Sequence, residues 1–438
     1  MSRKKTLSDL VPGGCHTYSK GNDTFPENVP EYLVKGKGAY VWDTNGKKFL
    51  DMTMGLTSVT LGHSFEKIDK KVIETLKNGL NFQRPTLLEF EMAKSFLNLV
   101  PNHQMIKFAK NGSTVTTAAT KIARAYTGRE LIAFPKQHPF FSYDDWFIGK
   151  TKCNYGIPKK IQDLSVTFDS CNLESLKNLF DKYPNKIACV IMEPIKPKCY
   201  SCNCQLEISN YLLQASQIVH KNKSLLIIDE MITGYKTAFP GLTSKLNIDS
   251  DITTWGKSIS NGYSFSCMTG KKEVMQLGGI EKNGEKKLFL TSSTHGAETI
   301  GIRGALETLK YYKKFNVIDR LHAIGNELII QTKALVKKEG LKSYIQISES
   351  PWLITFEFRN SQKVKDLKYH TLFSQFMIDN KILIQSSISI SISHTSKEID
   401  IFLEKFKSFL LIYRKALDNG IEPLLKGRPI KPVFRERV

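Results

Sequence analysis

The segment at residues 224–230 constrains the fold of this chain more than any other. It reads S-L-L-I-I-D-E, so a run of apolar residues ends in two acids. A short run that is apolar on both faces predicts a buried strand of a parallel sheet, and its acids then lie at the carboxyl edge of that sheet. Because α/β folds bind their ligands at this edge, the run predicts a ligand site as well as a strand.

A lysine follows this strand after one short segment. Lys257 comes directly after Gly256 in the sequence T-T-W-G-K-S. A lysine amine at a tight turn can form a Schiff base with an aldehyde. Asp229, buried at the end of the strand, needs a cationic partner, and a protonated pyridine nitrogen is one. Together the two residues predict pyridoxal 5′-phosphate as the cofactor.

Helical and strand-like patterns alternate between about residues 65 and 320. Residues 187–192 and 225–228 are apolar strands, and residues 208–220 between them have helical periodicity. This alternation predicts an α/β fold with a mostly parallel sheet that helices cover on both faces. Short strand-like runs and a helix at residues 399–418 predict a smaller α+β domain after it.

The patterns divide the chain into four segments. Residues 1–60 are expected to form an N-terminal arm with a β-hairpin that belongs to the small domain. Residues 61–320 are expected to form the large cofactor-binding domain, and residues 321–420 the C-terminal small α+β domain. Residues 421–438 contain prolines among charges and predict an irregular tail.

Composition and charge narrow the classes of function. The chain has 438 residues, and no apolar run approaches the ~20 residues of a transmembrane helix. No apolar stretch follows the basic N-terminus, so we expect a cytoplasmic protein that does not bind membranes. The net charge of +21 fits either a nucleic-acid binder or lysine-rich solvated helix faces. Because the lysines are scattered, the second interpretation is favoured, and nucleic acid is not an expected partner.

Three of the eight cysteines cluster in the sequence C-Y-S-C-N-C, at Cys199, Cys202 and Cys204. A structural zinc site needs a fourth ligand at a fixed spacing, and none is evident nearby. We therefore predict no metal site, and favour a reduced loop or a local disulfide.

A glycine turn at residues 111–119 leads into an alanine-rich helix. The backbone N–H groups of Gly112, Ser113 and Thr114 are expected to point outward at its start, where the helix dipole favours an anion such as a phosphate monoester. An ordinary Ser/Thr N-cap is the alternative. The cofactor residues downstream favour phosphate, and the hydroxyl-rich segment at residues 291–298 is a second candidate anchor.

Two further segments carry candidate side chains. The aromatic loop at residues 138–146 can stack a ring on a heteroaromatic ligand, or can simply pack in the core. Glu193 follows the apolar strand at residues 187–192, and it is either a second carboxylate near the ligand or a solvated strand end.

Five motifs, in this order, resemble those of the class III (fold type I) pyridoxal-phosphate aminotransferases. They are N-G-S-T at 111–114, M-E-P at 192–194, I-I-D-E-M-I-T-G-Y at 227–235, W-G-K at 255–257 and S-T-H-G at 293–296. The nearest subgroup is glutamate-1-semialdehyde 2,1-aminomutase and its aminotransferase relatives. The resemblance covers nearly the whole chain. It implies a large domain, with a mostly parallel seven-stranded sheet between helices, and a smaller α+β domain.

The resemblance also implies roles for individual residues. Lys257 forms the Schiff base and carries a proton between the substrate Cα and the cofactor C4′. Asp229 keeps the ring nitrogen protonated, so that the ring can accept electrons. Gly112, Ser113 and Thr114 hold the phosphate.

The remaining cofactor contacts rest on weaker matches. Phe140 is expected to stack on the ring, with His138 and Phe141 as alternatives, because H-P-F-F stands here where the family usually has Tyr-His-Gly. Glu193 is expected to lie beside the cofactor. Thr294 is implied to reach the phosphate of the neighbouring subunit, so a homodimer with shared active sites is expected.

The resemblance implies transfer of an amino group from an amino-acid donor to a carbonyl acceptor, both small molecules. The glycine-rich gating loop of the aminomutase is not evident around residues 150–160, and H-G-A-E at 295–298 resembles aminotransferases of surface-polysaccharide and secondary-metabolite pathways. We therefore favour an aminotransferase, with a sugar-derived or secondary-metabolite acceptor, over a 2,1-aminomutase. A non-catalytic polyanion-binding protein on this fold is the third hypothesis, and Lys257 argues against it.

Overall fold

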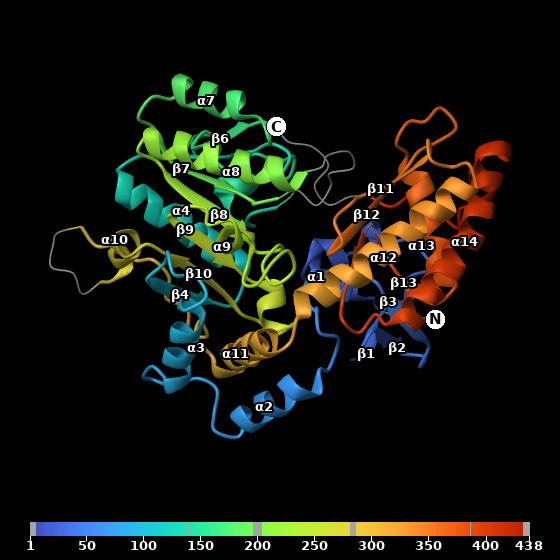
Figure 1. Cartoon of the computed structure of the whole chain (residues 1–438), viewed down its shortest axis with the longest axis horizontal. Helices are drawn as coiled ribbons and strands as arrows, with labels where there is room; N and C mark the ends of the chain where they lie inside the picture. The colour runs from blue at the N-terminus through green and yellow to red at the C-terminus, as the bar shows by residue number, and fades with distance from the viewer. Residues whose placement is uncertain (1–5, 139, 196–203, 281–285, 386, 432–438) are drawn as a thin grey trace. The chain divides into compact units, whose positions relative to one another are not determined.

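The computed structural model describes residues 6–138, 140–195, 204–280, 286–385 and 387–431, and Figure 1 labels its helices and strands. The chain divides into two compact units. One is formed chiefly by residues 66–196 and 203–318, and the other by residues 1–65 and 319–435. The division into four segments stays a prediction, because a compact unit need not coincide with a domain that folds by itself.

A seven-stranded sheet forms the centre of the first unit. Its strands are β4 (Met105–Ala109), β5 (Leu131–Pro135), β6 (Ser165–Phe168), β7 (Ile187–Met192), β8 (Leu225–Glu230), β9 (Ile252–Trp255) and β10 (Ser266–Gly270). They lie in the order β4-β10-β9-β8-β7-β5-β6. Neighbouring strands in the series β6, β5, β7, β8 and β9 pair in parallel, whereas β10 is antiparallel to both β9 and β4. The sheet is therefore mostly parallel, as the alternating pattern predicts.

Hydrophobic clusters on both faces of this sheet explain its apolar runs. The helices of the unit are α2 (Glu66–Leu76), α3 (Leu87–Leu97), α4 (Gly112–Thr127), α5 (Asp145–Ile148), α6 (Lys159–Gln162), α7 (Leu173–Lys182), α8 (Cys204–Lys221), α9 (Leu242–Lys245), α10 (Lys272–Met275) and α11 (Thr299–Lys314), with the 3-10 helices η5 (Lys257–Ser260) and η6 (Gln276–Gly278). Ile191 and Ile227 pack in a cluster with residues of α4, whereas Val190 and Ile228 pack in a second cluster with residues of α7 and α8. Successive strand residues point to opposite faces, so β7 and β8 must be apolar throughout.

The second unit is built on two small sheets. Its strands are β1 (Leu33–Lys37), β2 (Tyr40–Asp43), β3 (Lys48–Asp51), β11 (Ile345–Ile347), β12 (Leu353–Phe358), β13 (Ile382–Leu383) and β14 (Ser387–Ser389). Its helices include α13 (Leu367–Asp379) and α14 (Ser396–Asn419), together with most of α12 (Val317–Lys338). One sheet has the order β1-β2-β3-β13 and the other β11-β12-β14. Because β13 pairs with β3, the N-terminal arm and the C-terminal part of the chain belong to the same unit.

A short left-handed turn, labelled α1 (Met54–Thr57), follows β3 in this unit. Its four residues all have φ between +45° and +69°, which is a costly conformation for residues other than glycine. The buried Asp51 carboxylate supports the turn by accepting the backbone N–H groups of Thr53 and Met54, at 2.8 and 3.0 Å. Its second oxygen lies 2.8 Å from His63 Nε2.

Candidate active site

Four neighbouring parallel strands bring polar side chains to one edge of the large sheet. His138 follows β5, Glu193 follows β7, Asp229 is the penultimate residue of β8, and Lys257 follows β9. These strands are adjacent in the order β9-β8-β7-β5, and Figure 1 labels β7, β8 and β9 in the upper left of the view. Their carboxyl ends therefore form the edge where α/β folds bind ligands.

Asp229 is buried and keeps one carboxylate oxygen engaged with protein donors. Its Oδ1 accepts the backbone N–H of Met231 at 3.0 Å and the hydroxyl of Thr254 at 2.8 Å. Burial raises the pKa of this carboxyl to about 6; Glu193 adds to the rise, whereas His138 and the two hydrogen bonds oppose it. A cation bound at this position would favour the ionised carboxylate.

Lys257 begins η5 in a left-handed backbone conformation, with φ +49°. Burial lowers the pKa of its amine, while Glu193 and Asp229 act in the opposite direction. Strained backbone of this kind persists where the surrounding structure holds it, and it is common at functional sites. A lowered pKa increases the neutral fraction of the amine, which is the form that reacts with an aldehyde.

His138 and Glu193 lie next to each other, and they form an ion pair when the imidazole is protonated. His138 Nε2 lies 3.0 Å from Glu193 Oε2, and the two side chains are only 4% and 10% exposed. The His138 ring stacks on Phe141, with centroids 3.5 Å apart and an interplanar angle of 22°. His138 is therefore held both by an acid and by an aromatic ring.

The start of α4 combines the two interpretations of the glycine turn. Asn111 Oδ1 accepts the backbone N–H of Thr114 at 3.0 Å, which is an ordinary N-cap. Ser113 is buried, and its hydroxyl oxygen accepts the N–H of Tyr143 at 3.1 Å. The hydroxyl hydrogen of Ser113 therefore remains available to donate, and Gly112 and Ser113 are better placed than Thr114 to serve an anion.

Met231 brings the glycine turn and the lysine turn together. A Cβ atom at Gly112 would lie 2.9 Å from Met231 Sδ, and one at Gly256 would lie 2.2 Å from the same sulfur. A side chain at either position would have to displace the end of the Met231 side chain, which packs against each backbone. The end of β8, the start of α4 and the turn before Lys257 therefore meet around one side chain, which sequence reasoning did not single out.

Two predicted site residues lie apart from this group. Phe140 is 43% exposed, and its ring packs edge-on against Phe147 with centroids 5.8 Å apart. Thr294 is exposed in the segment before α11. An ion pair between Lys110 and Glu298 links this segment to the residue before Asn111.

Lys236 is a second buried lysine near this edge. It is only 1% exposed and follows Tyr235, a residue with φ +59°. Burial lowers the pKa of its amine well below the usual range, and the charge of Lys257 lowers it further. Two amines with lowered pKa values therefore share one electrostatic environment.

The cysteine cluster falls largely outside the described residues. Cys199 and Cys202 lie there, whereas Cys204 begins α8. Within the described ranges, no group of three or more His, Cys, Asp or Glu residues could hold a metal ion.

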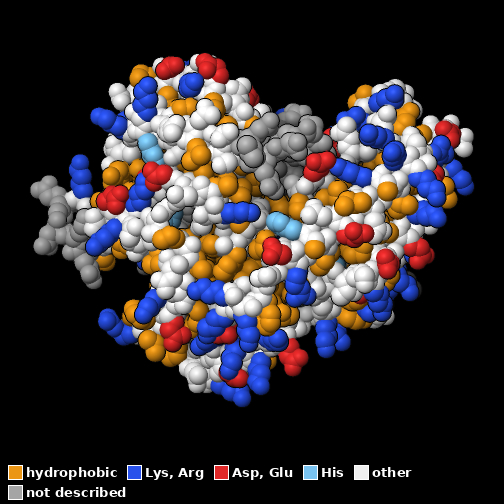
Figure 2. Space-filling model, viewed as in Figure 1, with side chains coloured by type: hydrophobic (Ala, Val, Ile, Leu, Met, Phe, Trp, Pro, Cys, Tyr) orange, Lys and Arg blue, Asp and Glu red, His pale blue; other side chains and the backbone are white. Residues whose placement is uncertain are grey.

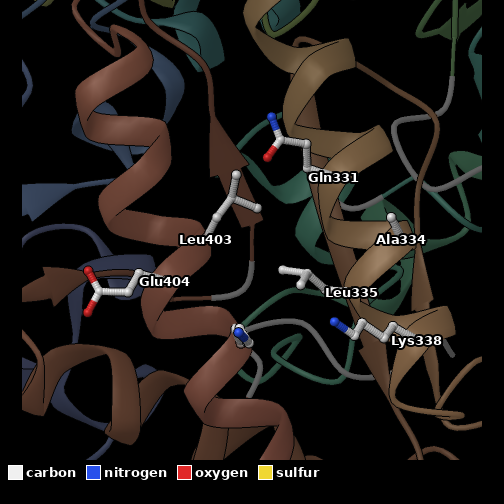
Figure 3. Close-up of a pocket in the computed structure, with 7 residues that line it drawn as sticks. Gln331, Ala334, Leu335, Lys338, Leu403 and Glu404 are labelled. Atoms are coloured by element: carbon white, nitrogen blue, oxygen red, sulfur yellow. The ribbon is translucent and has the colours of Figure 1, made fainter.

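A shallow groove in the second unit is lined by different kinds of side chain from those at the sheet edge (Figure 3). It lies between α12 and α14, and its lining is Gln331, Ala334, Leu335, Lys338, Leu403, Glu404 and Lys407. Figure 3 shows these side chains coming from two facing helices. The groove lacks a helix start and a buried carboxylate, so it does not suit a phosphorylated pyridine.

The residues at the sheet edge fit pyridoxal 5′-phosphate. The N–H groups at the start of α4 would suit the phosphate, and buried Asp229 would suit the ring nitrogen. The amine of Lys257 suits the aldehyde. The glycines that Met231 packs against keep these groups close together.

Comparison with known proteins identifies the family. The model of the family described as aminotransferase class-III matches residues 24–406. This chain belongs to the class-III aminotransferases. It is 26% identical over 421 residues to the 3-aminobutyryl-CoA aminotransferase of Cloacimonas acidaminovorans (strain Evry), across 95% of this chain and 98% of that protein. It is also 26% identical over 412 residues to the glutamate-1-semialdehyde 2,1-aminomutase of Francisella philomiragia, across 89% and 93%.

A solved structure shares the fold. The FumI protein of Sphingopyxis sp. MTA144, solved in a pyridoxal-phosphate form, superposes with a TM-score of 0.84 over 96% of this chain and 98% of that one, at 20% identity. The predicted resemblance and the fold type I α/β class are confirmed. This class-III aminotransferase is an enzyme, and its cofactor is pyridoxal 5′-phosphate. Across the described ranges, no helix has both the length and the hydrophobicity that a membrane span requires.

Proposed function

We propose that this class-III aminotransferase is intermolecular and moves an amino group from an amino-acid donor to a separate carbonyl acceptor. The convergence of Asp229, the start of α4 and the turn before Lys257 around Met231 supports the cofactor site. The H-G-A-E sequence at 295–298 favours the aminotransferase over the aminomutase. When bound, pyridoxal phosphate supplies an aldehyde that condenses with amines and a ring that draws electrons from the substrate Cα.

Each residue of the site then has a defined task. The Lys257 amine would hold the cofactor through its aldehyde, and it would take and return a proton at the substrate Cα. The Asp229 carboxylate binds the protonated ring nitrogen. Gly112 and Ser113 donate to the phosphate at the start of α4, and Thr114 supports them from its capped position.

We assign the ring face to His138 in preference to Phe140. His138 belongs to the same charge cluster as Asp229, whereas Phe140 is exposed and packs on Phe147. Met231 is the candidate for the opposite face, because it packs against the glycines on both sides of the site. Glu193 contributes through its ion pair with His138.

The first prediction tests the lysine. Purified protein should be yellow, and borohydride should fix the colour covalently on the peptide that carries Lys257. Lys257→Ala should lose turnover by several orders of magnitude and should not be labelled, because no other group takes its role. Lys236→Arg is the matched control, since it removes the other buried amine and should still be labelled at Lys257. Peptide mass spectrometry checks the site, and a label on Lys236 would contradict the proposal.

The aminomutase reaction is the second candidate, since relatives with both names match this chain at the same identity. The two reactions differ in stoichiometry. An aminotransferase forms one keto acid for each amino donor consumed, whereas a 2,1-aminomutase works on one substrate without a donor. A screen of donors and acceptors that follows keto acid release separates them.

We further propose a homodimer in the cytoplasm. Apolar side chains on and near α2 and α3 are exposed, among them Leu87 at 72% and Phe90 at 63%, and a second copy would bury such a surface. Thr294, which is also exposed, would then face the partner's phosphate site. Cys153 and Cys171 are free and exposed, which suits a reducing compartment.

The acceptor is proposed to be an anionic small molecule. The chain carries a net charge of +21, and Figure 2 shows Lys and Arg side chains spread over much of the face in view, with acidic side chains among them. A dispersed positive field attracts small anions without forming a nucleic-acid footprint. The phosphates of sugar-derived acceptors or of acyl-CoA substrates would provide such a charge.

A further inference from the structure

We propose that His138 and Glu193 are a charge-compensating pair, and that His138 thereby keeps Asp229 in the ionised form that binds the cofactor nitrogen. The proposal rests on the proposed function and adds a residue that tunes this site. His138 is here a positioning residue that acts on the ring nitrogen through two carboxylates, in addition to any contact with the ring face.

The arrangement of the strands creates the need for compensation. β7 lies between β5 and β8, so Glu193 at the end of β7 has His138 on one side and Asp229 on the other. Two carboxylates at adjacent strand ends oppose each other's ionisation, most strongly where water is excluded. Asp229 is 2% exposed and the Glu193 side chain is 10% exposed, so solvent screens their repulsion poorly.

The pair is built to hold its geometry. His138 Nε2 and Glu193 Oε2 are 3.0 Å apart, and the imidazole lies flat against Phe141 at a centroid distance of 3.5 Å. Phe141 is 2% exposed and packs in the hydrophobic core with Phe134 and Trp146. The imidazole therefore has a fixed support on one face and an acid at its edge.

The electrostatics of Asp229 agree with this arrangement. After burial, the Glu193 charge is the main cause that raises the pKa of Asp229, and His138 is the largest cause that lowers it. Lys257 on η5 is a further titratable group of the cluster, and both carboxylates act on it. Buried Lys236 interacts with Lys257, and buried Glu230 interacts with Asp229. A phenyl ring in place of the imidazole would remove the counter-charge that His138 supplies to Glu193 and Asp229.

The test is the pH dependence of cofactor binding by the apoprotein. Binding of pyridoxal 5′-phosphate is followed by visible absorbance between about pH 5 and 9 for the unsubstituted chain, His138→Phe, Glu193→Gln and the double variant. Loss of binding as the pH falls reports protonation of Asp229 together with protonation of the Lys257 amine, and an analogue without the ring nitrogen isolates the first. His138→Phe should move the midpoint up by about one pH unit, and Glu193→Gln should move it down by a similar amount. The double variant should return close to the unsubstituted midpoint.

Phe retains an aromatic face at position 138, so the variant separates charge from stacking. His138→Gln is a second variant without the charge, and it should shift the midpoint in the same direction as His138→Phe. The 1-deaza analogue of pyridoxal phosphate has no ring nitrogen, so the differences in midpoint between variants should vanish with it.

Opposite shifts for the two single variants are the signature that a merely structural role would not produce. Shifts in the same direction, or shifts that persist with the deaza analogue, would overturn this proposal alone. If the unsubstituted chain bound no pyridoxal phosphate at any pH, the proposed function itself would be refuted, and this inference with it.

Discussion

Among the described residues with left-handed backbone that are neither glycine nor asparagine, four illustrate two different settings. Lys257 and Tyr235 lie near the candidate active site, with φ +49° and +59°, and their surroundings hold them in place. Lys223 and Lys381 have φ +54° and +63°, but their side chains are on the surface. The conformation costs roughly 1–2 kcal/mol for an L-residue with a Cβ atom. The strain at Lys257 and Tyr235 belongs to the candidate active site. The candidate site does not require the strain at Lys223 and Lys381.

We therefore predict that Lys223→Gly and Lys381→Gly each raise the free energy of unfolding. The gain should be about 0.5–1 kcal/mol, because relief of strain exceeds the extra entropy that glycine adds to the unfolded chain. Lys407→Gly is the control, since Lys407 is exposed within α14 and glycine there should cost about 1 kcal/mol. Urea unfolding measures all three, and destabilisation by both of the first two variants would contradict the argument.

Single residues also show which parts of the site the sequence can predict. Asp229 and Lys257 could be singled out, because the local sequence is enough to infer the reactivity of a buried acid and of a lysine after a glycine. The pairing of His138 with Glu193 could not, since it depends on β5 and β7 being neighbours. Nor could the role of Met231, which appears only where two glycine backbones approach its sulfur. The direction of Phe140 likewise depends on how its loop packs.

At the scale of elements, the apolar runs predict which strands are buried, but not which strands are neighbours. The predicted strand at residues 187–192 is β7, and the helix expected at 399–418 is α14, Ser396–Asn419. The earlier start of α14 is explained by the Thr395 and Glu398 capping box. The strand order and the antiparallel β10 leave no local signal, because they follow from packing between distant segments.

A cluster of charges joins four elements at the opposite, amino-terminal edge of the large sheet. His220 Nε2 in α8 lies 2.8 Å from Asp251 Oδ2, which also accepts the N–H of Leu226 in β8 at 2.7 Å. Lys271 Nζ, after β10, lies 2.9 Å from the other oxygen of Asp251, just before β9. The hydrogen bond to Asp251 raises the pKa of His220. His220 therefore binds its proton more tightly in the folded state than in the unfolded state.

The raised pKa of His220 determines how its contribution to stability depends on pH. Because the pKa of His220 is raised on folding, its contribution is complete below the unfolded value of about 6.5 and is lost as the pH rises through the folded value. We predict that His220→Gln costs about 1 kcal/mol at pH 5.5 and clearly less at pH 9, as urea unfolding would show.

His103 provides a control of opposite sign. It is buried, and burial lowers the pKa of its imidazole, so it opposes folding at low pH. His103→Gln should therefore cost less at pH 5.5 than at pH 9. The same pH trend for both variants would show that a general effect of pH, and not the Asp251 hydrogen bond, governs the result.

At the scale of the whole molecule, the exposed apolar side chains of α2 and α3 predict a dimer. Leu87 and Phe90 are 72% and 63% exposed within two turns of α3. We expect the double variant Leu87→Glu/Phe90→Glu to be monomeric, because charge at the centre of an apolar interface prevents its burial. Ile330→Glu is the control, since Ile330 is also 63% exposed but lies on α12 in the other unit. Sedimentation at several concentrations distinguishes the species, and a dimeric double variant would contradict the assignment of the interface.

A dimer with shared active sites makes a sharper prediction than a dimer alone. If Thr294 serves the phosphate site of the partner, each active site takes Lys257 from one chain and Thr294 from the other. Lys257→Ala removes the amine, and Thr294→Asp places a negative charge beside the phosphate. Each variant alone should be inactive. In a mixed dimer, one site then carries both substitutions and the other carries neither.

Mixing the two inactive variants in equal amounts, with unfolding and refolding to exchange subunits, makes half of the dimers mixed. About a quarter of the unsubstituted activity should therefore return. If Thr294 instead serves the site of its own chain, both sites of every mixed dimer carry one substitution, and no activity should return. Recovery of activity on mixing, set against the same variants refolded separately, thus decides whether the hydroxyl segment before α11 completes the partner's active site.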